Sequence, residues 1–509
     1  MIADDLPSAE TKAVNRVPYA FAKSRGVIVA SVDDGGIGVI VRRDSTATLA
    51  LAEIRRVFGK PLKLTFVEPS VFEDRLEGLY SGQGADGGFS MMEDIGRDLK
   101  LQNLADDMPH ITDLLEAGDE APVIRFINVL ISQALAEKAS DIHIELFGTR
   151  SIVRFRVDGV LRDIIEPPRP LHSALVTRIK VIAGLDIAEK RLPQDGRITI
   201  GMGGRSVDVR VSILPTGHGE RVVLRLLDKR SGVLDLGQLG MGGTDMQMTD
   251  SLIRRPHGIF LVTGPTGSGK TTTLYAILSR LDLRKLNVLT VEDPVEYDLD
   301  GINQTQANAA IGMSFARALR SILRQDPDVI MIGEIRDLET AQIAVQASLT
   351  GHLVFATLHT NDSVGAVTRL MDMGVEPFLL ASSLLGVMAQ RLVRRLCPDC
   401  AEKHMADAKE RRIMGNGAEF IYTAVGCPKC KNTGYQGRSG VFEIFSVDDN
   451  VRKLIHDQAG EHEIRRHISE EMGAVNLRQA AMKLVAAGAT SLEEALRVTG
   501  DSSEGLADL

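Results

Sequence analysis

The sequence predicts an α/β protein built from several domains. The chain has 509 residues, which corresponds to about three domains at roughly 150 residues each. Between residues 141 and 227, β-branched residues alternate with polar ones, as in an antiparallel sheet. Beyond residue 243, short apolar strands alternate with helical stretches, which is the pattern of a parallel sheet covered by helices.

Residues 1–80 are predicted to be a small independent α/β domain. Apolar runs indicate strands over 27–30, 37–41 and 62–67, and a periodic stretch indicates a helix over 46–58. Residues 81–120 are predicted to be an acidic linker, because a glycine-rich run is flexible and residues 81–121 carry ten acidic and two basic side chains. The leucines within this acidic stretch are compatible with short helices.

A second domain, of α+β type, is predicted over residues 121–236. A helix is expected over 122–138, and strands are expected over 141–145, 151–157, 197–200, 206–213 and 221–227. The glycine-rich run 237–243 marks the next boundary. Residues 237–509 are predicted to be one α/β domain, in which 448–500 are helical and Gly488 is a stop.

Charge and hydropathy argue against several classes of protein. The 59 Lys and Arg residues and 68 Asp and Glu residues give a net charge of −9, most of it in the acidic linker. No basic field attracts nucleic acid or anionic lipid, so no nucleic-acid partner is expected. The acidic N-terminus lacks a signal-peptide core. The charge-free stretch 340–361 contains ten polar residues among its 22, so we expect buried core rather than a membrane span. The predicted location is the cytoplasm, with membrane contact only through a partner.

The four cysteines form two C-x-x-C pairs, Cys397 with Cys400 and Cys427 with Cys430, separated by 26 residues. Disulfides are disfavoured in the reducing compartment that we expect for this chain. Four thiolates at this spacing match a tetrahedral Zn²⁺ site. The alternatives are a thiol–disulfide couple, which does not explain the duplicated pair, and four unrelated buried cysteines. The sequence therefore predicts a structural zinc site within residues 397–430.

Residues 264–271 fit the phosphate-binding pattern G-x-x-x-x-G-K-[ST]. A strand is predicted over 258–263 and a helix over 271–283, so backbone N–H groups and a helix N-terminus can bind phosphates. Lys270 is expected to reach the β- and γ-phosphates, and Thr271 is expected to hold Mg²⁺. The predicted nucleotide-binding residues are Gly264, Pro265, Thr266, Gly267, Ser268, Gly269, Lys270, Thr271 and Thr272.

Two further strand ends supply the carboxylates that phosphoryl transfer needs. One apolar strand delivers Glu292, Asp293 and Glu296, and a second ends in Glu334. Ligands of open α/β sheets bind at this edge, although strand-end carboxylates also serve as helix caps. Glu334 is the predicted general base or water-orienting group, and Glu296 is its rival for that role.

Histidines and arginines near these segments are further candidates. His359 is a candidate sensor of γ-phosphate or metal. For His352, the sequence does not decide between that role and a hydrogen-bonded position in the core. Arginines can neutralise phosphate charge from another domain or subunit, or they can form salt-bridged surface. The candidates are Arg210, Arg221 and Arg225 on predicted strands, Arg317, Arg320 and Arg324 at the spacing of one helix face, and Arg336 after the Glu334 strand.

These residues, taken in order, resemble the secretion ATPases, and within them the type II secretion ATPases usually called GspE. The motifs are GPTGSGKTTTLY, VEDPVEY, DPDVIMIGEIRD and TGHLVFATLHTNDS, followed by the cysteine pairs. Upstream, ASDIHIE, VRFRVDGVLRD and RLPQDGR resemble the family's second N-terminal domain. The match covers residues 121–445 and extends toward the C-terminus. RVPYAFAKSRGVIV, a shorter signal, resembles the type II branch.

The resemblance implies a RecA-like P-loop ATPase domain, preceded by a PAS-like α+β domain and a small N-terminal α/β domain, with a zinc-binding subdomain. It implies a cytoplasmic homo-hexamer that binds ATP with Mg²⁺ between the RecA-like domain and the domain before it. Hydrolysis would extend a pseudopilus and export folded proteins. Residues 1–80 would dock on the cytoplasmic domain of a GspL-like inner-membrane protein, and a GspF-like platform protein would be a further partner.

The resemblance also implies residue roles. Lys270 and Thr271 would bind phosphates and Mg²⁺, Glu334 would be catalytic, and Glu296 and His359 would support it. The candidate charge sensors are Arg210, Arg225, Arg320, Arg324 and Arg336. The sequence departs from the family pattern only in its glycine-rich acidic linker, which leaves the relative placement of the first two domains open.

Other functions fit parts of the sequence. A type IV or competence pilus motor would use the same ATPase chemistry and differ in the platform that residues 1–80 bind. A DNA-handling motor is disfavoured by the net charge of −9, the lack of Trp and the 4% aromatic content, although Lys429, Lys431 and Arg438 lie near the second cysteine pair. An inactive scaffold is disfavoured by the complete phosphate-binding pattern and Glu334.

Overall fold

The computed structural model describes residues 22, 25–33, 36–43, 47–69, 71–72, 121–202, 205–228, 235–308, 311–415 and 419–500. The acidic linker predicted over 81–120 lies outside these residues, as does the start of the RVPYAFAKSRGVIV segment. Within these ranges, no helix combines the length and the apolar character that a membrane crossing needs.

The N-terminal region contains a three-stranded sheet in the order β1-β2-β3, with one helix packed on it. The elements are β1 (Val27–Asp33), β2 (Gly36–Arg42), α3 (Thr48–Phe58) and β3 (Leu62–Val67). β1 and β2 are antiparallel, whereas β2 and β3 are parallel because α3 carries the chain between them. Gly59 ends α3 in the left-handed conformation, with φ 65°. The three strands and the helix predicted from the sequence are confirmed.

The second region is a six-stranded antiparallel sheet in the order β6-β5-β4-β9-β8-β7. Its strands are β4 (Asp141–Phe147), β5 (Arg150–Val157), β6 (Val160–Ile165), β7 (Gln194–Met202), β8 (Arg205–Thr216) and β9 (Gly219–Asp228). Helices α7 (Ala121–Ala136) and α8 (Arg169–Ile182) share a buried core with the sheet. The antiparallel sheet and α7 are confirmed, whereas β6 and α8 were not predicted.

The third region is a seven-stranded sheet in the order β12-β11-β13-β14-β10-β15-β18. Its strands are β10 (Gly258–Thr263), β11 (Val288–Glu292), β12 (Asn303–Gln306), β13 (Val329–Ile332), β14 (Leu353–Leu358), β15 (Leu384–Leu396) and β18 (Tyr435–Ser446). All neighbours are parallel except β15 and β18. The predicted parallel sheet therefore ends in an antiparallel strand, because no crossover helix on the sheet connects β15 to β18.

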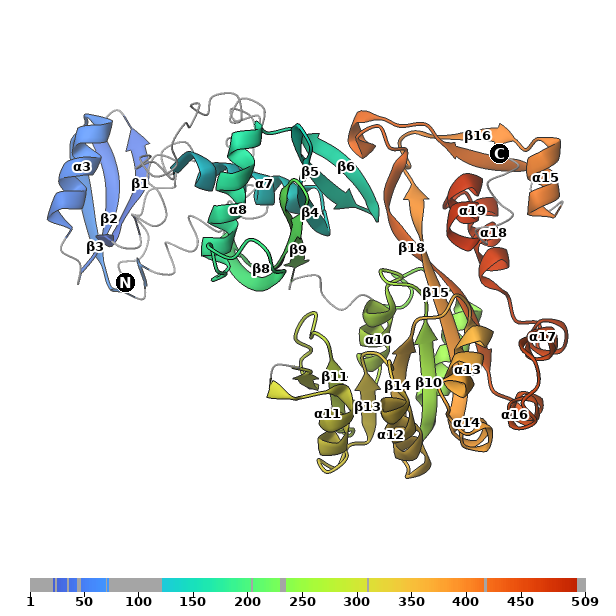
Figure 1. The fold of residues 1–509 in the computed structure, drawn as a ribbon. Helices are drawn as coiled ribbons and strands as arrows, with labels where there is room; N and C mark the ends of the chain where they lie inside the picture. Colours follow the sequence, from blue (N-terminus) through green and yellow to red (C-terminus); the bar gives the residue numbers. More distant parts are fainter. Residues whose placement is uncertain are drawn as a thin grey trace, which may run out of the picture.

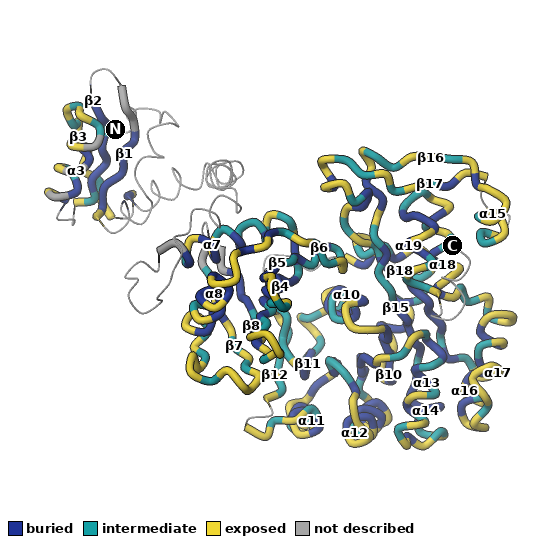
Figure 2. The backbone as a smooth tube through the Cα atoms, turned by 45° about the horizontal axis from the view of Figure 1, so that its top comes forward, coloured by how far each residue is buried: buried dark blue, intermediate teal, exposed yellow. Residues whose placement is uncertain are grey.

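Helices cover both faces of this sheet, and alternate residues of β10 pack on the two sides. Ile259 and Leu261 face one core, whereas Phe260 and Val262 face the other. The first core is covered by α11 (Phe315–Ile322), α12 (Leu338–Leu349), α13 (Ser363–Asp372), α14 (Pro377–Ser383), α16 (Asp449–His456) and α17 (Glu461–Arg466), and the second by α9 (Gly243–Ile253) and α10 (Lys270–Leu278). Figure 2 shows β10 buried along its length and the outer surfaces of α11 and α12 exposed. The charge-free stretch 340–361 is α12 and β14, and buried core as expected.

β15 and β18 extend beyond the other strands of the sheet and carry the segment between them, residues 397–434, which we call the cysteine module (Figure 1). The module holds the hairpin β16 (Ala401–Met405) and β17 (Phe420–Ala424), and α15 (Ala408–Met414). Helices α18 (Leu477–Ala486) and α19 (Leu492–Thr499) pack against its base. Residues 448–500 are mostly helical, and Gly488 follows α18 with φ 71°, as predicted.

The second region contacts the cysteine module and the start of β18. Lys431 Nζ lies 2.6 Å from Glu137 Oε1. Asp158, in the turn between β5 and β6, accepts the Gly437 N–H at 3.0 Å and lies 3.5 Å from Arg438 Nε. Polar contacts thus join the second region to the cysteine module and to the start of β18.

Candidate active site

The phosphate-binding loop, residues 264–271, connects β10 to α10 at the carboxyl edge of the parallel sheet. Gly264, Gly267 and Gly269 have φ of 150°, 79° and 88°, which side chains disfavour. A Cβ at Gly264 would lie 2.5 Å from the Gln390 backbone O, so the loop also needs glycine there for space. The predicted strand is confirmed, and α10 begins one residue earlier and ends at Leu278 rather than at 283.

Lys270 is only 8% exposed and its ammonium lies over the loop. Nζ donates to the backbone O of Gly264 at 2.8 Å and of Pro265 at 3.1 Å. Burial lowers the pKa of Lys270 to about 8, and the nearby charge of Arg391 adds to this, whereas Glu334 opposes it. The ammonium is therefore held by two weak carbonyl acceptors at the position where a phosphate would provide a full negative charge.

Glu334 and His359 follow neighbouring strands, β13 and β14, and their side chains meet. His359 Nε2 lies 3.3 Å from Glu334 Oε2, and Arg336 pairs with the other oxygen of Glu334. Arg336 also lies 3.6 Å from Asp293 Oδ2. Burial and the charge of Lys270 lower the pKa of His359, so its imidazole is neutral at pH 7. The structure therefore brings Lys270, Glu334, His359 and Arg336 into one electrostatic cluster.

The carboxylates after β11 have separate surroundings. Glu292 is 2% exposed and fully engaged: it accepts hydrogen bonds from Tyr275 and from Thr290 at 2.5 Å. Burial raises the pKa of Glu296, and Arg210 and Arg225 of the second region oppose that rise. Glu292 therefore stabilises the strand end, whereas Glu296 lies among arginines of another region.

A cavity of about 440 Å³ lies beside Glu296, between the two sheets. It is lined by Arg197, Thr199, Asp208, Val295, Glu296, Tyr297, Asp298, Gln304 and Gln306. Its second-region lining comes from β7 and β8, and its other wall comes from β12 and the segment after β11.

The other predicted arginines mostly have structural partners. Arg225 lies 2.9 Å from Asp141, and Arg221 lies 2.9 Å from Glu145. Arg320 pairs with Glu339 at 2.5 Å. The predicted shared helix face of Arg317, Arg320 and Arg324 is wrong for the last of them, because α11 ends at Ile322.

His352 lies at the opposite edge of the sheet from the phosphate-binding loop, just before β14. Its Nδ1 lies 2.8 Å from the Ala347 O, and its backbone O accepts the Gly258 N–H. The six residues of β14 separate it from the cluster by roughly 20 Å. His352 is therefore not part of the cluster, and it has the hydrogen-bonded position that was its alternative.

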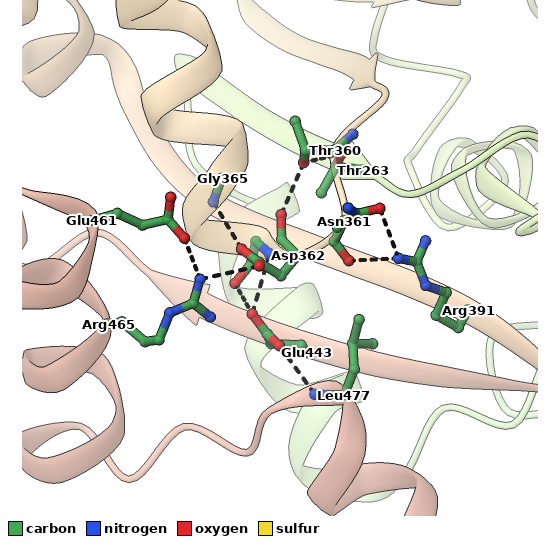
Figure 3. A network of polar contacts seen from close by, with 11 residues as sticks. Thr263, Thr360, Asn361, Asp362, Gly365, Arg391, Glu443, Glu461, Arg465 and Leu477 are labelled. Atoms are coloured by element: carbon green, nitrogen blue, oxygen red, sulfur yellow. Dashed lines mark hydrogen bonds and ion pairs between the residues drawn. The ribbon is translucent and has the colours of Figure 1, made fainter. Parts of the chain in front are cut away.

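Sequence reasoning missed three residues near the phosphate-binding loop: Asn361, Gln390 and Arg391. Gln390 is 1% exposed and Arg391 donates to Asn361 (Figure 3). In the sequence, Gln390 and Arg391 could have been noticed because they are two polar residues directly after the apolar run 377–389. Their neighbours in the fold could not be read from the sequence, because β15 pairs with β10 across more than 120 residues.

The four cysteine sulfurs form a compact group, with all ligand atoms within 4.8 Å of one another. The Sγ–Sγ distances of 3.7 and 3.9 Å match the edge of about 3.8 Å of a tetrahedron with Zn–S bonds of about 2.3 Å. The N–H groups of Cys427 and Gly434 donate to the sulfur of Cys430 and hold its pKa low, at about 6, although burial opposes this, whereas burial raises the pKa of Cys400 to about 12. The donor set therefore fits Zn²⁺.

A phosphate-binding loop at the edge of a parallel sheet, with a carboxylate and a histidine at adjoining strand ends, defines a RecA-like P-loop ATPase. The chain belongs to the family of type II/IV secretion system proteins, whose model matches residues 116–497. A second model, which describes an N-terminal domain of GSPII protein E, matches residues 16–80.

Named relatives extend over nearly the whole chain. The type II secretion system protein HxcR of Pseudomonas aeruginosa is 55% identical over 486 residues, which are 96% of this chain and 99% of that protein. The type II secretion system ATPase E of Vibrio cholerae is 52% identical over 501 residues, 98% of this chain and 99% of that protein. The solved Legionella pneumophila ATPase DotB has the same fold, with a TM-score of 0.55 at 21% identity, over 73% of this chain and 94% of DotB.

Proposed function

We propose that this chain is the ATP-hydrolysing motor of a type II secretion system, which drives pseudopilus assembly and protein export. The observation that carries the proposal is the cluster of Lys270, Glu334 and His359 at the phosphate-binding edge of the sheet. Relatives 51–55% identical over nearly the full chain support the secretion assignment. The match of residues 16–80 to a domain of GSPII protein E favours secretion over pilus assembly.

In this proposal, residues 264–272 bind the phosphates through backbone N–H groups and the N-terminus of α10. Lys270 exchanges its two carbonyl acceptors for phosphate oxygens. Glu334 orients or deprotonates the attacking water, and neutral His359 donates a hydrogen bond that reports whether the γ-phosphate is present. Glu296, rather than being the general base, would hold Arg210 and Arg225 near the nucleotide, because its electrostatic partners are those arginines.

A Mg²⁺ ion would be held by hard oxygen donors, which this site offers in the Thr271 hydroxyl and the carboxylates of Glu334 and Asp293. When bound, the ion neutralises phosphate charge. The four cysteines would hold Zn²⁺ as a structural ion, since all four positions of the tetrahedron are taken by protein ligands.

Assembly follows from the position of the arginines. Arg210 and Arg225 lie outside the RecA-like region, in β8 and β9, so in this proposal another domain or a neighbouring subunit completes the site. We propose a homo-hexamer in which these residues, with Arg320, Arg324 and Arg336, respond to phosphate charge. In the cell, residues 1–80 would attach the motor to the cytoplasmic domain of a GspL-like inner-membrane protein, and the motor would act on a GspF-like platform protein from the cytoplasm.

The hydrolysis proposal is tested by Lys270→Ala and Glu334→Gln in the full chain. Lys270→Ala should abolish nucleotide binding and turnover. Glu334→Gln should bind ATP normally but hydrolyse it about 10²–10⁴ times more slowly, because only proton transfer or water orientation is lost. Both are measured by phosphate release and by titration with a fluorescent ATP analogue. Normal turnover by Lys270→Ala would contradict the site assignment.

The secretion proposal is tested by binding of the full chain to two purified cytoplasmic domains from the source organism. One is that of the type II secretion platform protein, and the other is its type IV pilus counterpart. Selective binding to the first is expected. Selective binding to the second would assign the motor to pilus assembly and leave the ATPase chemistry intact.

A further inference from the structure

β15 runs beside β10 and continues past its end, so it forms one wall of the phosphate-binding loop. Ala389 pairs with Thr263, the last residue of β10, and the next two residues of β15 are Gln390 and Arg391. Gln390 Nε2 would lie 2.9 Å from a Cβ at Gly269, and its backbone O would lie 2.5 Å from a Cβ at Gly264. The loop is therefore packed directly on Gln390, whose Oε1 is buried without a hydrogen-bond partner.

Arg391 carries a positive charge close to Lys270 and contacts the segment after β14. Its Nη2 donates to the Asn361 O at 2.9 Å and to Asn361 Oδ1 at 3.3 Å. Burial lowers the pKa of Arg391, while the carboxylates of Asp362 and Glu443 offset part of that effect. Arg391 is half-buried, and its side-chain hydrogen bonds are with Asn361 rather than with an acid. The guanidinium is thus placed to hold the Asn361 segment.

The Asn361 segment is also fixed to the phosphate-binding loop itself. Thr360 Oγ1 lies 2.7 Å from Thr263 Oγ1, and the Thr360 N–H donates to the same atom at 3.0 Å. Thr263 directly precedes the loop, and His359 directly precedes Thr360. Asn361 therefore lies two residues from His359, in a segment that is hydrogen-bonded to the start of the phosphate-binding loop.

On its other side, the same segment joins a polar network that reaches the C-terminal helices (Figure 3). Asp362 caps α13 by accepting the Gly365 N–H at 2.8 Å, and its second oxygen accepts from Arg465 of α17 at 3.0 Å. Glu443 of β18 accepts from Ser363 and from the Leu477 N–H at 3.0 Å. These contacts fix Asp362 and Ser363, so Arg391 holds Asn361 against a rigid anchor.

We infer that Arg391 is a positioning residue for ATP hydrolysis: by holding Asn361, it keeps His359, and through it Glu334, aligned with the phosphate-binding loop. The inference rests on the proposed function. Arg391 touches neither nucleotide nor water in this role, so its loss changes the turnover step rather than nucleotide binding.

The test compares Arg391→Ala, Arg391→Lys and Asn361→Ala in the full chain. Arg391→Ala should lower kcat at least tenfold while the Kd for a fluorescent ATP analogue changes less than threefold. Arg391→Lys should recover part of the loss, because an ammonium can still donate to the Asn361 O. Single-turnover hydrolysis is the readout, since it detects slow reactions.

Asn361→Ala removes the 3.3 Å side-chain bond but keeps the backbone O that accepts from Arg391 at 2.9 Å. It should therefore cause a smaller loss than Arg391→Ala, and the double variant should be no slower than Arg391→Ala alone. Arg395→Ala, an exposed arginine on the same strand, is the matched control and should keep wild-type kcat. The inference is overturned if Arg391→Ala keeps kcat within twofold, if the two losses multiply, or if the affinity for the ATP analogue and the thermal stability fall together with kcat. Lys270→Ala in the same assay separates failure of this inference from failure of the proposed function. Turnover by that variant would contradict the proposed ATPase site itself.

Discussion

At the scale of single residues, Lys270 has the most informative environment. Its ammonium is buried against backbone carbonyls, and its pKa is lowered to about 8. Bound phosphates would raise that pKa again, because opposite charge favours the protonated form. Nucleotide binding and protonation of Lys270 are therefore linked.

This linkage predicts a pH-dependent affinity for ATP. Phosphate binds the ammonium form, so binding is strongest below pH 8 and weakens as the pH rises through that value. With a pKa of about 8, the Kd should rise about eightfold between pH 7.5 and 9.0 if only the protonated form binds. Calorimetry at pH 8 in two buffers of different ionisation enthalpy should report uptake of about half a proton per ATP. A pH-independent Kd without proton uptake would contradict the linkage.

Only part of the candidate site could be predicted at this scale. The phosphate-binding loop and Glu334 were visible because each lies next to a short apolar strand, and the strand end fixes the position of its neighbours. His359 was named as a candidate sensor, whereas the role of His352 stayed open, since both flank the same strand. The structure separates them, because one lies at each edge of the sheet. Arg391 and Asn361 were missed because their contact depends on strand order.

At the scale of helices and strands, an element could be predicted where its own residues show a clear apolar pattern between clear boundaries. β10 is an uninterrupted apolar hexapeptide between clear boundaries, and the sequence predicts its bounds correctly. β6 contains Arg162 and Asp163, which break the apolar alternation. α8 mixes β-branched residues with arginine and has no side-chain cap, so its helical period is weak in the sequence. Both β6 and α8 pack on a core that forms only when the strands of the sheet assemble, so their own residues do not predict them.

The cysteine module allows a prediction about metal removal. Chelation of zinc should unfold residues 397–434 locally, because buried thiolates without the ion repel one another, whereas ATP binding should persist since the phosphate-binding loop lies in a separate core. Hydrogen exchange with and without chelator should show loss of protection in β16 and β17 but not in α10. Lys409→Ala, on the exposed surface of α15, is a control that should change neither. Unaltered exchange after verified metal loss would contradict a structural role.

At the scale of the whole molecule, the second region is joined to the cysteine module and β18 by polar contacts near the surface. The basic partners, Arg438 and Lys431, are 44% and 52% exposed, whereas the acidic partners, Asp158 and Glu137, are 21% and 9% exposed. Because one side of each pair faces solvent, salt should screen these contacts. The arrangement of the two regions is therefore easy to change, as a motor that cycles between nucleotide states requires.

Removal of these contacts should loosen the arrangement without unfolding either region. In the Asp158→Ala/Lys431→Ala double variant, energy transfer between fluorophores introduced as unnatural amino acids at Ser173 and Lys409 should shift to a broader distance distribution. High salt should produce the same change in the wild-type chain, and the melting temperature should stay constant. Lys429→Ala is the matched control, because Lys429 pairs with Asp399 inside the module. An unchanged distribution in the double variant would mean that other contacts hold the regions together.

The long antiparallel pair β15 and β18 has a mechanical consequence. At 13 residues and about 3.3 Å per residue, β15 spans roughly 43 Å from the interior of the sheet to the cysteine module. The phosphate-binding loop packs on Gln390, near the midpoint of β15, so a tilt of the pair about that point would be largest at its far end. A tilt of about 10° around that point would displace the tip by roughly 4 Å. A small displacement beside the nucleotide would thus be enlarged at the tip of the pair, where it could act on a neighbouring protein.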